Sequence, residues 1–561
     1  MPSTFLRFLA ILAATALLAA CALAQSADTI LVNGKVLTVD SQFSTREAIA
    51  IRDGKIAATG TTVEIRKLAG PATRVVDLAG RTVIPGLIDS HMHAIRAGQS
   101  FATEVNWIGA RSIAEATGRI HEASLTMKPN SWLIVAGGWT PEQFSENAKF
   151  KENRRPTQAE LVAVAPNNPV YVQLGYGWSV LTPVALKILN LSSDADLPPG
   201  AKFDRDAAGT LTGGVTGGQN AIVALFDKLP KPNFEQQVEG TRRFFRELNR
   251  LGLTGVVDPG GNNVAPEDYQ ALFKVWRDKQ LTLRVAYALC GQNPDAEFDD
   301  IRANTQLLPM GFGDDLLRFN GLGERITWAM NNNDKPSDTD KERYYQILVW
   351  AAQRGMAITM HWNNDQSADQ LLSIFERVNR EVPITNLRWS IAHLNNATEP
   401  TLRRMKALGV GWTVQDATYF ASPQAQKNPD IRREPPVMTA KAIGVAMGAG
   451  TDAHRVASYN PFTALQWFLD GKTVAGVALR GPEETPSRAD ALRLYTMGSA
   501  WFSRDETQRG SLEPGKLADL AVLSKDYMTA PVDQIGGIES LLTMVGGRVV
   551  YAVGPYANLE K

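Results

Sequence analysis

The chain has 561 residues, of which 44% are hydrophobic and 21% are charged, a composition typical of a globular protein and unlike that of a disordered one. This length exceeds one ordinary domain and leaves room for a large core with appended parts. Lys and Arg together number 58, as do Asp and Glu, and no long basic run occurs, so nucleic-acid binding through a phosphate-neutralising surface is not expected.

The first 24 residues predict export. Arg7 precedes an apolar run from Phe8 to about Leu18, which is short for a membrane span, and the small residues 22–24 provide a cleavage site for a signal peptide. The run "LAAC" ending at Cys21 also resembles a bacterial lipoprotein signal, in which that cysteine carries the lipid. Either route places the mature chain in the periplasm or outside the cell, and an uncleaved anchor is the third alternative.

Cysteine usage is sparse, because Cys21 and Cys290 are the only two in the sequence. Since Cys21 is removed or lipidated in both processing routes, the mature fold must hold without an intrachain disulfide. Beyond the first 24 residues no run of 18 apolar residues occurs, so no membrane span is expected in the mature chain.

Both ends of the mature chain have a β pattern. Residues 25–82 contain short alternating runs broken by Asn33-Gly34 and Asp53-Gly54, which are hairpin signals. Residues 506–561 repeat this pattern. We therefore expect one small β-sandwich formed by both chain ends, with the rest of the chain inserted between them.

Residues 83–505 alternate strand-like runs with helical stretches such as 369–380. Eight strand–helix units predict an α/β fold, a distorted (β/α)8 TIM barrel. Residues from about 100 to 250 interrupt the rhythm after the first barrel strand and predict an insertion with strands of its own. The eight strand-like runs lie at residues 82–93, 253–261, 282–291, 316–324, 356–364, 387–396, 409–417 and 444–454.

Four of the six histidines and one aspartate fall at the carboxyl ends of these runs. His91 and His93 end the first, His361 the fifth, His393 the sixth and Asp452 the eighth. A barrel gathers the last residues of its strands at one face, and residues two apart in an extended segment point to the same side. Imidazoles and a carboxylate gathered there predict a site for a divalent metal. The other two histidines are expected to be structural, His121 as an exposed helix residue and His454 beside the site.

The segments "PGLIDSHMH", "GTDAH" and "GSLEPGKLADLAVL" resemble the amidohydrolase superfamily, and specifically its amidohydrolase-3 branch of YtcJ-like metal-dependent hydrolases. The resemblance covers residues from about 28 to 555. It implies a distorted barrel, a sandwich from both ends and one or two metals, usually zinc. His91 and His93 match the first-strand pair of the family, and His361, His393 and Asp452 match its later ligands. In the third segment, Glu513, Lys516 and Asp519 are expected to fix turns and to take no part in the chemistry.

Two positions depart from the family pattern. Many relatives carry a lysine on the fourth strand whose carbamate bridges two metals, and Arg318 stands where that lysine is expected. A guanidinium stays protonated and cannot form the carbamate, which argues against a bridged pair of metals unless Glu324 substitutes. Relatives often have Gly-His where this chain has Tyr176 to Trp178, so these aromatic residues either shape the substrate pocket or pack in the core.

The favoured arrangement is one zinc ion held by His91, His93, His361 and Asp452, with one position left for water. Asp452 then carries the proton from the water to the leaving group, while His393 stabilises the oxyanion. In the two-metal alternative His393 becomes a ligand of the second ion.

The predicted function is an exported metal-dependent amidohydrolase that attacks the carbonyl of an amide, formamide or cyclic amide. Its partner is a small-molecule substrate, and neither that substrate nor the oligomeric state follows from the sequence. An esterase or lactonase on the same site is one alternative, because an activated water attacks either carbonyl. A catalytically weak exported binding protein on a hydrolase scaffold is the other.

Overall fold

The structure is a computed structural model, and it describes residues 26–128, 130–145, 152–261, 264–331, 333–420 and 434–560. The predicted export signal, including Cys21, lies outside these residues. Within them, no helix is both long and apolar enough to cross a membrane. Cys290 is buried and unpaired.

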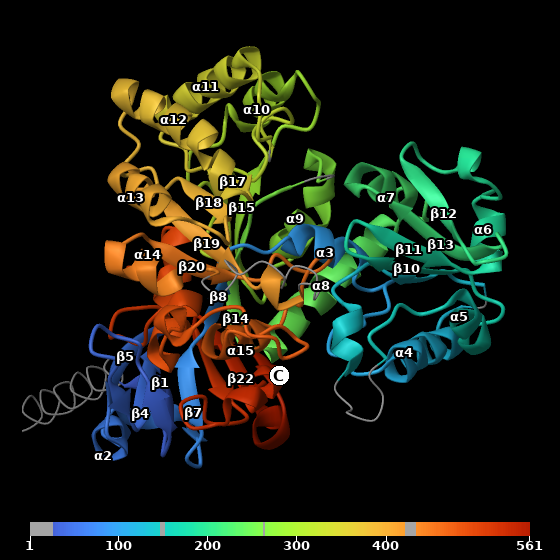
Figure 1. Cartoon of the computed structure of the whole chain (residues 1–561). Helices are drawn as coiled ribbons and strands as arrows, with labels where there is room; N and C mark the ends of the chain where they lie inside the picture. Colours follow the sequence, from blue (N-terminus) through green and yellow to red (C-terminus); the bar gives the residue numbers. More distant parts are fainter. Residues whose placement is uncertain are drawn as a thin grey trace, which may run out of the picture.

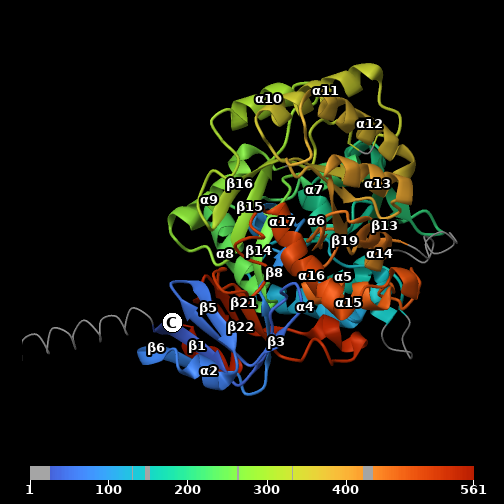
Figure 2. The same cartoon turned by 90° about the vertical axis from the view of Figure 1, so that its left-hand side faces the viewer.

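The two chain ends meet in two β-sheets that pack against one apolar cluster. β7 pairs with β2 on one side and with β21 on the other, which joins strands from both ends of the chain in one sheet. Leu31 and Val76 of one sheet, and Val83, Val522 and Leu542 of the other, are buried together in this cluster. Figure 2 shows the N-terminal strands beside the C-terminal ones.

The first of these sheets has the order β5-β4-β1-β6 and the second the order β23-β22-β21-β7-β2-β3. Their strands are β1 (Ala27–Val32), β2 (Lys35–Leu37), β3 (Thr45–Arg46), β4 (Ala48–Arg52), β5 (Lys55–Gly60), β6 (Ala69–Asp77), β7 (Thr82–Pro85), β21 (Leu520–Leu523), β22 (Ser540–Val545) and β23 (Arg548–Ala552). Helix α2 (Thr62–Arg66) follows β5.

One of the two predicted hairpins is wrong. Asp53 and Gly54 do turn β4 back onto β5 as an antiparallel hairpin. The turn at Asn33-Gly34 instead carries the chain from β1 in one sheet to β2 in the other. A side chain on Gly34 would lie 2.3 Å from Leu78, so close packing, and not hairpin geometry, is the reason for glycine there.

All eight strands predicted for the middle of the chain are present, and they form two four-stranded parallel sheets with the orders β16-β15-β14-β8 and β17-β18-β19-β20. Backbone hydrogen bonds connect the sheets at both pairs of edges: Leu322 N donates to Ala357 O (3.0 Å), and Ser90 N donates to Ala449 O (2.9 Å). The strands are β8 (Leu87–Asp89), β14 (Leu253–Asp258), β15 (Arg284–Leu289), β16 (Leu317–Leu322), β17 (Thr359–Trp362), β18 (Ser390–His393), β19 (Gly411–Gln415) and β20 (Met447–Gly450).

Amphipathic helices follow these strands and cover them. In α12, for example, Leu371, Phe375 and Val378 recur at helical spacing and are all buried. The longer helices of this region are α8 (Phe234–Arg250), α9 (Gln270–Arg277), α10 (Glu297–Thr305), α11 (Asp338–Gln353), α12 (Asp365–Glu381), α13 (Glu399–Leu408), α14 (Val437–Ile443) and α15 (Pro461–Asp470). The short helices α16 (Arg488–Arg493) and α17 (Ser499–Phe502) lead back to the terminal sheets.

The region between β8 and α8 forms a separate layer, to the right of the central strands in Figure 1. It starts with α3 (Ala94–Ser100), which packs on α8. A five-stranded sheet follows, with the order β12-β13-β11-β10-β9 and apolar clusters of its own. Its elements are α4 (Ile113–Thr126), β9 (Leu133–Val135), α5 (Gln158–Val164), β10 (Val170–Leu174), β11 (Trp178–Leu181), α6 (Pro183–Ile188), β12 (Ala201–Arg205), β13 (Leu211–Gly217) and α7 (Gln219–Phe226).

Candidate metal centre

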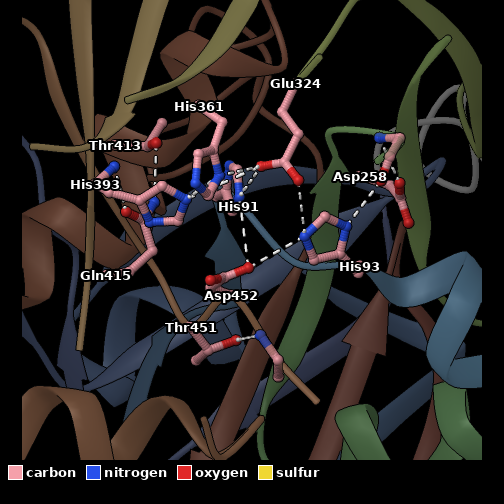
Figure 3. A network of polar contacts seen from close by, with 12 residues as sticks. His91, His93, Asp258, Glu324, His361, His393, Thr413, Gln415, Thr451 and Asp452 are labelled. Atoms are coloured by element: carbon pink, nitrogen blue, oxygen red, sulfur yellow. Dashed lines mark hydrogen bonds and ion pairs between the residues drawn. The ribbon is translucent and has the colours of Figure 1, made fainter. Parts of the chain in front are cut away.

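All five predicted ligands converge at the carboxyl ends of the central strands, together with Glu324 (Figure 3). His91 and His93 follow β8, Glu324 follows β16, His361 lies in β17, His393 ends β18 and Asp452 follows β20. Their donor atoms form three overlapping groups, each with every donor atom within 4.8 Å of the others: His91, His93 and Glu324; His91, His393 and Asp452; and Glu324, His361 and His393.

Glu324 belongs to two of these groups and lies between them. Its Oε1 atom is 3.4 Å from Nε2 of His93, while its Oε2 atom is 3.2 Å from Nε2 of His91 and 3.2 Å from Nδ1 of His361. Nε2 of His393 is in turn 2.8 Å from Nδ1 of His361. One carboxylate thus contacts His93 with one oxygen, and His91 and His361 with the other.

Asp452 closes the site on the opposite side. Its Oδ1 atom lies 3.1 Å from Nε2 of His93 and 3.7 Å from Nε2 of His91. The backbone of Asp452 has a positive φ of 56°, and that of His393 a φ of 71°, both in the left-handed region that side chains rarely adopt. Such backbone conformations are concentrated at functional sites, where the surrounding structure holds them in place.

A second layer of buried polar groups orients the ligands. Asp89 joins two ligand loops: its Oδ1 atom accepts the amide hydrogen of His91 (2.9 Å) and its Oδ2 atom accepts the hydroxyl of Thr451 (2.8 Å). Gln415 Oε1 accepts the amide hydrogen of His393 (2.8 Å). These contacts fix the backbone from which the side chains project, as supporting groups commonly do around metal ligands.

The hydrogen bond of Nδ1 determines the tautomer of His93. Nδ1 lies 2.7 Å from the carbonyl oxygen of Gly260, which only accepts, so Nδ1 carries the proton. In the neutral ring Nε2 therefore presents a lone pair toward the carboxylates of Asp452 and Glu324. Two carboxylates facing this nitrogen need a positive charge beside it, which a proton on Nε2 supplies in the metal-free site and a bound cation would supply in its place, so the arrangement fits a metal site.

Burial and neighbouring charges set the ionisation of the site. Burial disfavours the charged form of Glu324, yet His93 and His361 hold the pKa of its carboxyl well below the usual range. Burial also opposes ionisation of Asp452, but its hydrogen bond with His93 and the nearby histidines lower its pKa to about 2. Burial and the neighbouring His361 lower the pKa of His393 to about 3. Ionised carboxylates beside a neutral imidazole are the forms that bind a divalent cation.

His91 provides a further test of whether the residues fit a metal. Its ring is fully buried, and neither nitrogen has the geometry of a hydrogen bond with a described residue, although Nε2 faces Oε2 of Glu324 at 3.2 Å. A buried polar atom without a partner is costly, and a coordinated cation would satisfy it. Four imidazoles with two carboxylates form a donor set that suits zinc and other first-row divalent metals.

The assignment of Arg318 to the bridging position is wrong. Arg318 lies at the start of β16, at the opposite end from the site, where its guanidinium pairs with Asp505 (2.6 Å). Glu324, two residues beyond the end of β16, occupies the place between the histidines instead. Strand direction explains the difference, because only the carboxyl end of a parallel strand reaches this face.

The sequence predicts Glu324 only as a substitute for the bridging lysine and not among the five expected ligands, although its position near a strand end is that of a ligand. It ends the fourth strand-like run, the same position that His91, His361 and Asp452 occupy in theirs. Spacing from the strand end would have selected Glu324 over Arg318. Asp89 left no such signal, because its role depends on Thr451, which is 362 residues away in the sequence.

The remaining residues predicted near the site have structural contacts. Nε2 of His454 lies 2.9 Å from Glu104, and His121 is exposed on α4. Trp178 is buried in β11 and donates from its indole nitrogen to Asp204 (2.8 Å), so it packs in the inserted layer. Asp519 forms a buried ion pair with Arg284 (2.7 Å), as expected for a residue that holds the terminal sheets in place.

The chain is similar to known proteins over almost its whole length. Residues 74–551 match the model of the Amidohydrolase family. The N-substituted formamide deformylase of Arthrobacter pascens is 25% identical over 549 residues, which cover 94% of this chain and 99% of that protein. The putative amidohydrolase YtcJ of Bacillus subtilis (strain 168) is 22% identical over 551 residues, covering 92% of this chain and 98% of that protein.

Among solved structures, an uncharacterized metal-dependent hydrolase from Pyrococcus horikoshii shares the fold, with a TM-score of 0.63 and 21% identity over 90% of this chain and 99% of that one. The family match spans most of the chain and includes every residue of the centre described above. The chain therefore belongs to the amidohydrolase family, in its YtcJ-like branch, and is a metal-dependent hydrolase that acts on carbon–nitrogen bonds other than peptide bonds.

Proposed function

We propose that this protein hydrolyses the carbonyl–nitrogen bond of an amide, formamide or cyclic amide at a centre of two divalent cations, zinc first among them. His91, His93 and Asp452 would hold one cation, and His361 with His393 the second. The observation that carries this assignment is the position of Glu324, whose carboxylate lies between the first-strand histidines and His361 and contacts both. A carboxylate placed in this way can serve both cations, so a bridged pair of metals does not require a lysine on the fourth strand.

Divalent cations bound there would polarise the substrate carbonyl and lower the pKa of water to about 7. Asp452 is the proton carrier, because its carboxylate is ionised and lies at the edge of the histidine cluster, with Oδ1 3.1 Å from Nε2 of His93. It accepts a proton from the attacking water and returns it to the nitrogen as the carbon–nitrogen bond breaks. His393 is a ligand in this assignment; the single-cation alternative leaves it to donate a hydrogen bond to the oxyanion.

We infer further that the two central sheets form one distorted (β/α)8 barrel and that the terminal sheets form one sandwich. The hydrogen bonds at both edges of the central sheets support the first, and the shared apolar cluster supports the second. Export to the periplasm or beyond, with a possible lipid anchor at Cys21, rests on the first 24 residues of the sequence.

Metal analysis combined with matched substrates tests this function. We expect about two metal ions per chain after growth with added zinc, and hydrolysis of N-formyl or N-acyl amides at higher kcat/KM than of their ester analogues. Higher kcat/KM for the esters would favour the esterase or lactonase. A metal content below about 0.3 per chain, with no turnover of either substrate, would favour the binding protein.

A further inference from the structure

A cavity of about 140 Å³ lies where the inserted layer meets the central strands. Helix α3, helix α7 and the segment that follows Asp452 all line it, and Figure 1 shows α7 beside α3. Its volume equals roughly four or five water molecules in the liquid, at about 30 Å³ each, which is enough for one small polar group of a ligand. The proposed mechanism uses none of its residues.

Two arginines line this cavity, Arg96 on α3 and Arg455 after β20. Arg96 is only 9% exposed, and the Nε atoms of both guanidinium groups are buried without a hydrogen-bond partner. Across the residues that the structure describes, neither side chain makes a hydrogen bond or an ion pair. Burial lowers the pKa of Arg455, which shows the cost of holding its charge there.

The carboxylates near these arginines make their direct contacts with other groups. Glu104 lies 2.9 Å from His454. Asp268 accepts the amide hydrogen of Ala265 (2.7 Å), and Asp227 lies 4.0 Å from Lys231 at the mouth of the cavity. Phe226 packs its ring against Arg455, with 4.0 Å between the guanidinium carbon and the ring centroid, which orients the planar group. Neither guanidinium group therefore forms a direct ion pair with a carboxylate of the described residues, although Glu104 and Asp258 lie close enough to interact with them electrostatically.

Both arginines are tied to the metal centre by the chain itself. Arg96 is three residues beyond His93 and Arg455 is three residues beyond Asp452, so each lies at most about 11 Å along the backbone from a ligand. The arginines therefore lie within a distance of the centre that a substrate of modest length can span. Guanidinium groups bind carboxylates through paired hydrogen bonds, which fixes the orientation of the bound group.

We propose that this cavity binds the anionic group, a carboxylate, of an amide substrate whose scissile bond lies at the metal centre. The inference rests on the proposed function and narrows its substrate class to amides that carry a negative charge, such as N-acylated amino acids. Arg96 and Arg455 are then the residues that select for this charge.

The test compares two substrates that differ only in the carboxylate, N-formylphenylalanine and N-formylphenethylamine, on the zinc-loaded full chain. We expect the wild-type enzyme to prefer the first by at least about 10-fold in kcat/KM, and Arg96→Gln or Arg455→Gln to reduce that ratio by about 10- to 100-fold. Arg277→Gln, on the exposed end of α9, is the matched control and should keep the ratio. A wild-type enzyme without the preference, or variants that retain it, would overturn the proposal.

Calorimetric binding of 3-phenylpropanoate, which has no bond to cleave, separates this proposal from the proposed function. We expect both Gln variants to bind it at least about 10-fold more weakly than wild type at equal metal content. The affinity of Arg455→Lys should lie between those of wild type and Arg455→Gln, because lysine keeps the charge but lacks the planar guanidinium group. If no amide is hydrolysed but this difference persists, the proposed function fails and the anion site stands. Equal binding by all variants, or equally tight binding of inorganic phosphate by wild type, would refute the carboxylate site.

Discussion

Nδ1 of His361 lies 3.2 Å from Oε2 of Glu324, whose other oxygen faces His93 at 3.4 Å. This carboxylate therefore contacts both the first-strand histidines and His361. Removing its charge while keeping its shape should weaken both halves of the centre. We expect Glu324→Gln to reduce the metal content from about two to about one per chain and kcat by at least about 100-fold.

Elemental analysis and steady-state kinetics measure the two effects on the same preparation. Glu122→Gln, an exposed change on α4, is the control and should leave both values unchanged. Two metals per chain in Glu324→Gln would show that this carboxylate does not hold the centre together.

Asp452 has a separate role as proton carrier. Asp452→Asn keeps the side-chain volume but removes the base, so kcat should fall by about 100- to 10,000-fold while the melting temperature changes little. A pre-steady-state comparison of wild type and variant shows whether the chemical step has slowed. Near-normal turnover in Asp452→Asn would exclude this assignment.

Arg318 belongs to a buried ionic cluster at the far end of its strand. Asp505 is 4% exposed and pairs with Arg318 and with Arg509, each at 2.6 Å. Removing the shared carboxylate leaves the buried Arg509 and the partly exposed Arg318 without this partner, so Asp505→Asn should lower the free energy of unfolding by about 3 kcal/mol without changing the metal content. Denaturant titration and elemental analysis test the two statements independently.

Arg318→Lys is the companion change. Residue 318 lies roughly 20 Å along the strand from residue 324, at about 3.3 Å per residue, so a lysine there cannot reach the metals. We expect the metal content of this variant to equal that of wild type. An additional metal bound by Arg318→Lys would contradict the placement of residue 318 at the end of β16 that is remote from the centre.

Gly450 allows the last strand to lie against the first ligand loop. A methyl group at this position would be 2.7 Å from the amide nitrogen of His91 and 2.9 Å from Oδ1 of Asp89. Gly450→Ala should therefore destabilise the fold by about 1–3 kcal/mol and lower zinc affinity, because His91 must shift. Gly177→Ala, whose added methyl group meets no atom within 4 Å, is the matched control. Thermal melting with and without zinc measures both effects.

Metal removal should destabilise the whole protein. The centre holds two buried carboxylates and four imidazoles in close contact, and a cation that binds only the folded state stabilises it by about 3–4 kcal/mol at 100 to 1,000 times its Kd. Dialysis against a chelator should lower the melting temperature by several degrees, and added zinc should restore it. An unchanged melting temperature in metal-free protein would argue against the centre.

Much of this architecture was predictable from local patterns. Eight strand-like runs and the polar residues at their ends were sufficient to place five ligands, because the direction of a parallel strand fixes which residues reach the shared face. The family motifs, from "PGLIDSHMH" to "GSLEPGKLADLAVL", led to the same fold and to the same ligands.

Only the tertiary structure decided the rest. The contacts of Glu324 with histidines from two strands, the hydrogen bond from Thr451 to Asp89, and the shared cavity of Arg96 and Arg455 depend on segments far apart in the chain. Local sequence patterns do not predict such contacts, because they depend on how the folded strands and loops are placed relative to one another. The sequence by itself therefore determined which residues are capable of chemistry and at which strand ends they lie. Packing determined that the histidines share the carboxylate of Glu324, and that Arg96 and Arg455 lie in one cavity without a direct ion pair.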